Sequence, residues 1–150
     1  MSMRKIIFRA KRTYNGKWVE GFFVKRIEPL TLIPKCYILV QEEDTSGITG
    51  EPTGYLNTEF SWYEVIPETF GQYTGLTDKN GKKIFEGDIV RYGDTIHKVV
   101  FEHRNDTAYF GLVYSPFETL PFGHYQELKQ IEVIGNIHDN PELMKGGEEK

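Results

Sequence analysis

The segment from Gln72 to Val90 constrains the fold of this chain more than any other part of the sequence. Turn-forming residues recur along it at short intervals. Asp78, Asn80 and Gly81 are typical of a tight turn, in which the carboxylate accepts backbone N–H groups and Asn or Gly adopts a left-handed conformation. Gly87 predicts a second sharp corner, directly before an apolar run. Turns this closely spaced leave room only for short strands, so the segment is predicted to be architectural rather than catalytic.

The N-terminal residues predict a β-hairpin. Ile6, Phe8 and Ala10 alternate with other residues, several of them basic, which is the period of a strand buried on one face. An Asn-Gly pair at positions 15–16 supplies the positive φ angles of a tight hairpin turn. Residues 18–24 are predicted to form the returning strand.

Four or five short strands joined by tight turns are predicted between Asp88 and Ile137. This pattern favours a small antiparallel barrel of the SH3-like kind, since closing the sheet removes edges that would otherwise pair with other chains. Asn140 followed by Pro141 and Glu142 predicts a short helix, because Asn caps a helix, Pro fits its first turn and Glu complements its dipole. The predicted fold class is therefore mainly β: an N-terminal β-hairpin region joined to a small SH3-like antiparallel barrel, with a short C-terminal helix.

The pattern of turn residues and apolar runs changes after Gly71, which predicts that the chain has two parts. Residues 1–70 are expected to form an N-terminal β-rich region with an exposed acidic loop at residues 41–54, where turn residues are frequent and apolar periodicity is lacking. Residues 71–150 are expected to form the small β-barrel domain with its C-terminal helix.

The net charge of −4 conceals a strong asymmetry along the chain. Residues 1–35 contain nine Lys or Arg and two acids, whereas residues 36–78 contain eight acids and no Lys or Arg. A basic end can indicate a nucleic-acid or acidic-protein partner. The alternative is that the basic and acidic segments face each other, either within the fold or across an oligomer.

The composition predicts a soluble cytoplasmic protein. Cys36 is the only cysteine, which excludes an intramolecular disulfide and favours a reducing compartment. The apolar run at residues 6–8 is too short for a signal peptide, and no run approaches the roughly 18 apolar residues of a membrane span. We therefore expect no membrane partner.

No pattern predicts a catalytic, cofactor-binding or metal site. Residues 78–81 lack the ligand series of an EF-hand loop, because Gly is fourth and no acid follows at the twelfth position. Glu86 and Asp88 would share one side of an extended backbone, but an acid pair needs a cleft and perturbed pKa values. We prefer the interpretation that Asp88 holds a corner by accepting backbone N–H groups. The histidines are scattered at His97, His103, His124 and His138. Together with one cysteine, they form no zinc motif.

The N-terminal hairpin offers one candidate for nucleic-acid binding. Cations beside aromatic side chains are what single-strand binders use, although the overall negative charge makes nucleic acid the less favoured partner. The candidate contacts are Arg9, Lys11, Arg12, Lys17 and Trp18.

Three blocks of the sequence resemble the YopX protein family, which is found in bacteriophages and prophages. They are residues 4–10, with the pattern RxIxFRA, residues 73–90 and residues 131–143. Lys11 stands where family members often have Trp, and residues 25–60 match no family pattern. The structural signature is Tyr73, Thr74, Gly75, Asp78, Asn80, Gly81, Gly87, Asp88, Gly135 and Asn136.

The resemblance implies a phage-derived, β-rich protein of the bacterial cytoplasm with no established activity and no catalytic residues. We therefore expect a non-enzymatic interaction or accessory protein without cofactors. Its partner would be a second copy of itself, or a host or phage protein. Candidate contacts are the acidic loop, Tyr37 and the irregular, exposed aromatic loop expected at residues 116–123, around Phe117 and Phe122. The alternative is a nucleic-acid-binding module that uses the basic aromatic hairpin.

Overall fold

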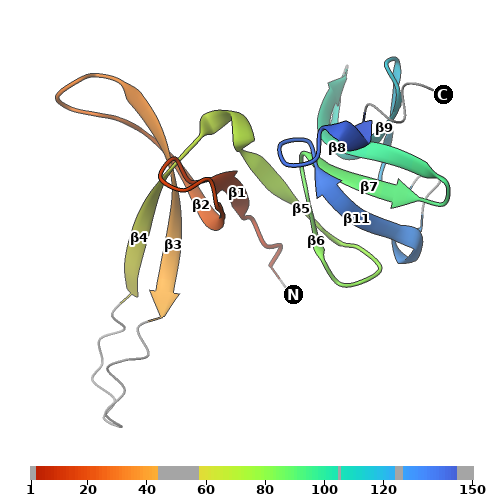
Figure 1. The fold of residues 1–150 in the computed structure, drawn as a ribbon, viewed down its shortest axis with the longest axis horizontal. Helices are drawn as coiled ribbons and strands as arrows, with labels where there is room; N and C mark the ends of the chain where they lie inside the picture. The colour runs from red at the N-terminus through yellow and green to blue at the C-terminus, as the bar shows by residue number, and fades with distance from the viewer. Residues whose placement is uncertain (1–2, 44–57, 105, 124–126, 145–150) are drawn as a thin grey trace, which may run out of the picture. The chain divides into compact units, whose positions relative to one another are not determined.

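The computed structural model describes residues 3–43, 58–104, 106–123 and 127–144. The fold is mainly β, with two antiparallel sheets of six and five strands and one short helical turn at residues 142–144 (Figure 1). The chain divides into two compact units. The N-terminal unit is Ile7–Phe70, and the C-terminal unit is Gly71–Lys150 together with Met1–Ile6. Among the described residues, no helix has the length and apolar character needed to span a membrane.

The N-terminal unit contains four strands of the six-stranded sheet, in the order β4-β3-β2-β1. They are β1 (Phe8–Lys11), β2 (Trp18–Ile27), β3 (Pro34–Glu43) and β4 (Thr58–Val65), followed by the 3-10 turn η2 (Pro67–Thr69). The predicted hairpin is present: β1 and β2 pair antiparallel, and Gly16 in their turn has a φ of 70°. An Asn-Gly turn fits here because Gly adopts this conformation without steric cost.

The sheet of the N-terminal unit curls until the ends of β1 and β4 meet. Arg12 forms an isolated bridge with Val65, and the N–H of Ile66 donates to the carbonyl of Lys11 at 2.8 Å. Inside the curl lies a core of four buried residues, Ala10, Cys36, Ile38 and Val65. Three aromatic rings extend it: Phe70 lies 5.1 Å from Phe8 and 4.4 Å from Phe23, measured between ring centroids.

The C-terminal unit contains β5 (Gly71–Thr77) and β6 (Lys83–Phe85), which pair with each other and are the other two strands of the six-stranded sheet. The five-stranded sheet has the order β10-β9-β8-β7-β11. Its strands are β7 (Asp88–Tyr92), β8 (Thr95–Arg104), β9 (Thr107–Ser115), β10 (Glu118–Pro121) and β11 (Ile131–Asn136), the last preceded by the 3-10 turn η3 (Leu128–Gln130). The core of this unit is Ile84, Val90, Val99, Leu112, Ile131 and Val133.

The closed SH3-like barrel predicted for this unit is not found in the part of the chain that the structure describes. The expected strands form and β10 is added to them, but β10 and β11 stand at opposite ends of the strand order. β10 has only four residues and ends at Pro121, which has no N–H to donate to a further strand. The sheet therefore lacks the pairing that would close it.

Two predicted loops also differ from the structure. Residues 41–43 of the acidic loop expected at 41–54 belong to β3, and residues 44–54 lie outside the described part of the chain. The irregular aromatic segment expected at residues 116–123 contains β10, which pairs with β9.

Candidate functional site

The signature residue Asp78 holds two separate segments through one buried carboxylate. Its Oδ1 accepts the N–H groups of Asn80 at 2.8 Å and Lys82 at 2.9 Å, and its Oδ2 accepts the N–H of Val133 at 2.9 Å. Gly81 closes the turn with a φ of 78°. Burial opposes the charge of Asp78, but the three backbone donors outweigh burial and keep its pKa below the ordinary value.

The signature residues of β5 and the corner after β6 also serve the backbone. The Thr74 hydroxyl donates to the carbonyl of Ile84 at 2.8 Å, and the Tyr73 ring packs 5.5 Å from that of Phe85. Gly75 and Gly87 both have positive φ angles, of 87° and 92°. Asp88, which is 1% exposed, accepts the N–H of Phe85 at 2.7 Å.

Residues 131–143, the third block of the sequence signature, fold around Asn136. Its Oδ1 accepts the N–H groups of His138 at 3.0 Å and Asp139 at 2.9 Å, and its Nδ2 donates to the Asp139 carboxylate at 3.0 Å. A Cβ at Gly135 would lie 2.5 Å from Oδ1 of Asn140, so any larger residue there would force the Asn140 side chain to move. The signature residues thus hold turns and corners of the C-terminal unit.

Of the histidines weighed in the sequence, His124 lies outside the part of the chain that the structure describes. His97 is 4% exposed, and its ring nitrogens contact the carbonyl of Val113 at 3.0 Å and the hydroxyl of Thr95 at 2.7 Å. In the described ranges, no three His, Cys, Asp or Glu side chains are grouped closely enough to hold a metal ion. Glu86 lies at 3.4 Å from the N–H of Gln72.

An exposed aromatic surface of the N-terminal unit lies on the sheet face opposite its core. The register places Phe22 of β2 beside Leu39 of β3, and Trp62 of β4 on the other side of Leu39. Phe60 lies two residues before Trp62 in β4, and side chains two residues apart on a strand share a face. Phe22, Phe60 and Trp62 are 50%, 44% and 48% exposed. We call the side chains on this side the outer face: Phe22, Val24, Tyr37, Leu39, Phe60 and Trp62.

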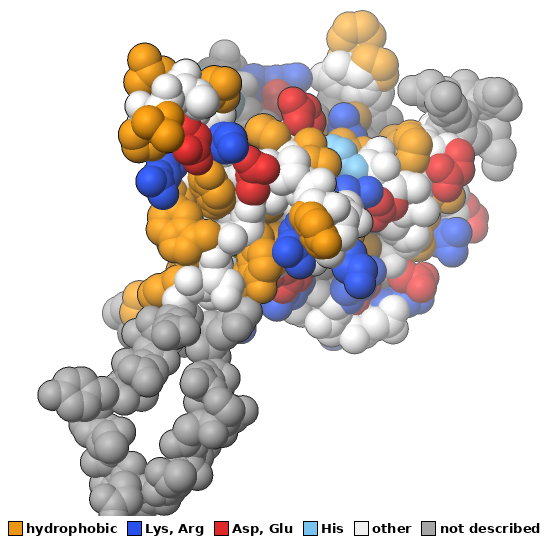
Figure 2. Space-filling view, turned by 60° about the vertical axis from the view of Figure 1, so that its left-hand side comes forward, with side chains coloured by type: hydrophobic (Ala, Val, Ile, Leu, Met, Phe, Trp, Pro, Cys, Tyr) orange, Lys and Arg blue, Asp and Glu red, His pale blue; other side chains and the backbone are white. Residues whose placement is uncertain are grey.

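The aromatic rings of the outer face contact one another across the strands. Phe22 meets Phe60 edge to face at 6.4 Å, and Tyr37 meets Trp62 edge to face at 5.6 Å. Figure 2 shows hydrophobic side chains gathered on this unit, at the left of the view. Contiguous exposed apolar surface of this kind is typical of interaction sites.

Three of the five candidate nucleic-acid contacts come together on the β1–β2 hairpin. The guanidinium of Arg9 lies 4.7 Å and the ammonium of Lys11 lies 5.5 Å from the Trp18 ring centroid. Arg12 is directed elsewhere, 4.2 Å from the ring of Tyr63. Lys17 is exposed in the hairpin turn.

The turn between β2 and β3 presents four exposed aliphatic side chains. Ile27, Leu30, Leu32 and Ile33 are 62%, 97%, 75% and 55% exposed, and we call them the aliphatic tip. The backbone is fixed by hydrogen bonds from the N–H of Leu32 to the carbonyl of Glu28 at 2.8 Å, and from the N–H of Glu28 to the carbonyl of Ile33 at 3.0 Å. Leu32 has a φ of 58° and is the one non-glycine residue with positive φ among those described.

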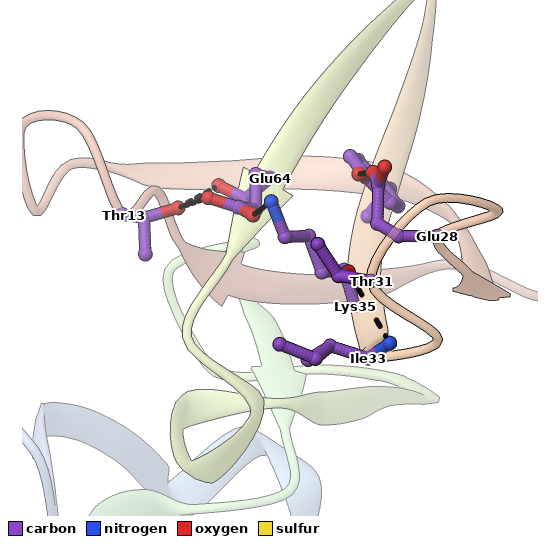
Figure 3. A network of polar contacts seen from close by, with 7 residues as sticks. Thr13, Glu28, Thr31, Ile33, Lys35 and Glu64 are labelled. Carbon is purple, nitrogen blue, oxygen red and sulfur yellow. Dashed lines mark hydrogen bonds and ion pairs between the residues drawn. The ribbon is translucent and has the colours of Figure 1, made fainter.

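A chain of polar contacts lies at the base of the tip (Figure 3). Glu64 accepts the hydroxyl of Thr13 at 3.0 Å and pairs with the ammonium of Lys35 at 3.2 Å. The hydrogen bond from Thr13, followed by that from Lys35, lowers the pKa of Glu64. The hydrogen bond to Glu64 raises the pKa of Lys35. The hydroxyl of Tyr37 donates to Glu28 at 2.9 Å, which raises the pKa of Tyr37.

Sequence reasoning did not combine the aromatic residues of the outer face, because they come from three strands and only the register brings them together. Of the predicted aromatic contacts elsewhere, Phe117 is 85% exposed, whereas Phe122 packs against the core of the C-terminal unit. The aliphatic run at residues 27–33 was a visible signal, since it contains four large apolar residues around Pro29 and is followed by Pro34.

Comparison with known proteins identifies the family. No curated protein matches the sequence. Among solved structures, the chain is similar to protein EF1440 from Enterococcus faecalis, with 24% sequence identity over 95% of this chain and 99% of that one, and a TM-score of 0.46. The model of the family described as YopX protein matches residues 7–145. Because this match spans nearly the whole sequence, the chain belongs to the YopX protein family.

Proposed function

We propose that this YopX family protein is a non-catalytic interaction protein of phage origin that acts in the bacterial cytoplasm by binding a macromolecular partner on the outer face. The observation that carries the proposal is the exposure of Phe22, Phe60 and Trp62, each close to one half, on a single face of the sheet. An isolated exposed aromatic residue needs no explanation, whereas three in one patch do.

The size of the patch supports a binding role. Fully burying a large apolar side chain stabilises a complex by about 1.5–3 kcal/mol. Three side chains that are half exposed therefore offer roughly 2–4 kcal/mol to a partner that covers them. Tyr37 and Leu39 extend the surface between them. Aromatic side chains of this kind are also the residues enriched at the centres of protein interfaces.

The use of the buried polar groups supports a role without catalysis. Asp78, Asp88 and Asn136 accept backbone N–H groups at turns, and His97 bridges two strands. Such contacts stabilise a fold and leave these groups committed to structural partners. The outer face and the tip beside it, in contrast, present exposed apolar side chains to solvent.

A capture experiment tests the proposal. The full chain and its Phe22→Thr/Trp62→Thr variant are immobilised and exposed to a bacterial lysate, because Thr suits an exposed strand and removes the ring. Phe101→Thr is the matched control, since Phe101 is also 50% exposed and also meets another ring edge to face. We expect a complex with the wild type and the control that the outer-face variant loses. Equal capture by all three chains would refute the role of the outer face.

A second candidate function is the binding of single-stranded nucleic acid on the β1–β2 hairpin. It is favoured by the two cations within 5.5 Å of the Trp18 ring and by Tyr14, which is 89% exposed beside Arg12. Aromatic rings beside cations bind successive bases by stacking and backbone neutralisation.

A mobility-shift assay with short single-stranded DNA and RNA at low ionic strength tests this candidate, because phosphate contacts are strongest there. We expect Lys11→Gln/Tyr14→Ser to weaken any shift, and Lys98→Gln to leave it unchanged. A wild-type chain that shifts neither nucleic acid at low salt would exclude this function.

A further inference from the structure

The tripeptide Asn-Gly-Lys occurs in two turns of this chain. The first copy is Asn15–Lys17, in the turn between β1 and β2, and the second is Asn80–Lys82, in the turn between β5 and β6. In an Asn-Gly pair the backbone nitrogen of glycine can attack the asparagine side chain, because glycine has no side chain to hinder ring closure. Since the tripeptide is the same, a marked difference in reactivity between the two copies comes from the fold.

The two turns share several features that govern this reaction. All three residues of each tripeptide are exposed, and both glycines have positive φ angles, of 70° and 78°. A Cβ added at either glycine would meet nothing within 4 Å apart from its chain neighbours. Ring closure also breaks a similar hydrogen bond in each turn. The N–H of Gly16 donates to the carbonyl of Arg12 at 2.8 Å, and that of Gly81 donates to the carbonyl of Asp78 at 3.0 Å. These features do not separate the two sites.

The side-chain amide of Asn15 is held in a position that favours the reaction. Its Oδ1 accepts the N–H of Lys17 at 3.0 Å, so the side chain folds back along the chain past Gly16. This Asx turn brings Cγ of Asn15 toward the nitrogen of Gly16, which are the two atoms that must bond. The N–H of Lys17 also stabilises the amide oxygen as it gains negative charge during the attack, as a donor in an oxyanion hole does.

At the second tripeptide the equivalent N–H is already bound by another side chain. The N–H of Lys82 donates to the carboxylate of Asp78 at 2.9 Å, and the N–H of Asn80 donates to the same oxygen at 2.8 Å. Asp78 is 7% exposed, and its other oxygen accepts the N–H of Val133. Ring closure would strain these hydrogen bonds, and the charge of the carboxylate opposes the negative charge that develops beside it.

We propose that Asn15 is a site of spontaneous deamidation and that the turn held by Asp78 protects Asn80 from the same reaction. The nitrogen of Gly16 bonds to Cγ of Asn15, and its proton leaves with Nδ2 as ammonia, which forms a cyclic succinimide. Water then opens the ring. Cleavage between Cγ and the nitrogen gives aspartate at position 15, whereas cleavage between the backbone carbonyl carbon and the nitrogen gives isoaspartate. In both products the new carboxyl group releases its proton to water.

The reaction changes the charge and the length of the β1–β2 turn. Either product adds a negative charge between Arg12 and Lys17, which are two of the candidate nucleic-acid contacts. Isoaspartate also lengthens the backbone of the turn by one carbon atom. The inference is independent of the proposed function, because the turn does not belong to the outer face.

Mass spectrometry of the folded full chain after incubation at neutral pH tests the inference. Cleavage after glutamate at acidic pH, where the reaction is slow, yields residues 1–20 and 69–86 as separate fragments with one asparagine each. Conversion replaces an NH2 group by OH, which changes the fragment mass. We expect fragment 1–20 to convert about tenfold or more faster than fragment 69–86, because Asn80 reacts only after hydrogen bonds to a charged group open.

Three controls separate the effect of the fold from that of the tripeptide. The chain unfolded in guanidinium chloride should convert both fragments at similar rates. Asn15→Gln should leave fragment 1–20 unconverted over the same period, because the longer side chain must close a larger ring. Asp78→Ser should speed the conversion of Asn80 and leave that of Asn15 unchanged. Circular dichroism verifies that each variant is folded.

The order of conversion decides the inference. Faster conversion of Asn15 than of Asn80 in the folded chain, with the difference lost on unfolding, supports it. Equal rates in the folded chain, faster conversion of Asn80, or a difference that persists in guanidinium chloride would overturn it. So would a folded chain in which Asn15 stays intact over a period in which the unfolded chain converts.

Discussion

The carboxylate of Asp78 accepts a hydrogen bond from the backbone N–H of Val133 at 2.9 Å, although the two residues are 55 positions apart. The same carboxylate closes its own turn through Asn80 and Lys82. One side chain of the signature therefore ties the β5–β6 turn to β11, within the C-terminal unit.

Replacing Asp78 by Ala should destabilise the protein strongly. The change leaves three N–H donors without their acceptor, and one lost hydrogen bond to a charged group costs about 1.5–3 kcal/mol. We expect a loss of about 3 kcal/mol or more in the free energy of unfolding, measured by urea denaturation. Asp94→Ala is the control, because Asp94 is exposed in the β7–β8 turn. A loss no larger than that of the control would contradict the role of Asp78.

The contribution of Asp78 should depend on pH in a defined direction. Its pKa is lowered in the folded protein, so its ionised form stabilises the fold above the unfolded pKa of about 3.9, and this stability is lost as the pH falls through the folded pKa. The difference in unfolding free energy between the wild type and Asp78→Asn should be largest near neutral pH and shrink below about pH 4. Urea unfolding over a pH series measures it, and a constant difference would contradict the assignment.

Leu32→Gly should stabilise the fold. A left-handed non-glycine residue costs about 1–3 kcal/mol, part of which is offset by the greater freedom of glycine in the unfolded chain. We expect a net gain of about 0.5–1 kcal/mol in thermal or urea unfolding. Leu30→Gly provides the comparison, since Leu30 has no positive φ and should lose stability instead. The prediction fails if the two glycine variants behave alike.

Gly135→Ala should destabilise the C-terminal unit through a steric clash. The added Cβ would lie 2.5 Å from Oδ1 and 2.8 Å from Cγ of Asn140. Forced repacking of this kind costs about 1–3 kcal/mol. In an Asn140→Ala background these two atoms are absent, so the cost of Gly135→Ala should be smaller there. Equal costs in both backgrounds, measured by urea unfolding, would show that the clash lies elsewhere.

Features that depend on neighbouring residues could be predicted from the sequence. The turn at Gly16 and the β7–β8 hairpin follow from local turn chemistry and alternation. β5 was harder to predict, because Gly75 interrupts it with a positive φ and its pairing with β6 shifts register between Tyr73 and Thr77. A glycine within a strand locally resembles a turn.

Features that depend on distant pairing could not be predicted. The run from Cys36 to Val40 is continuously apolar, so it has no alternation of polar and apolar residues that would show which side chains face the core. Only the register with β2 and β4 shows that Ile38 is buried and that Phe22 and Trp62 lie on the opposite face. The acceptor role of Asp78 toward Val133 is hidden for the same reason.

The assignment of Met1–Ile6 to the C-terminal unit makes residues 7–70 an insertion between two pieces of one folding unit. A cut at residue 70 therefore does not liberate an intact C-terminal half, since it discards the first segment of that half. Exchanging residues 7–70 as a cassette, with both flanking segments retained, would keep each of the two units whole.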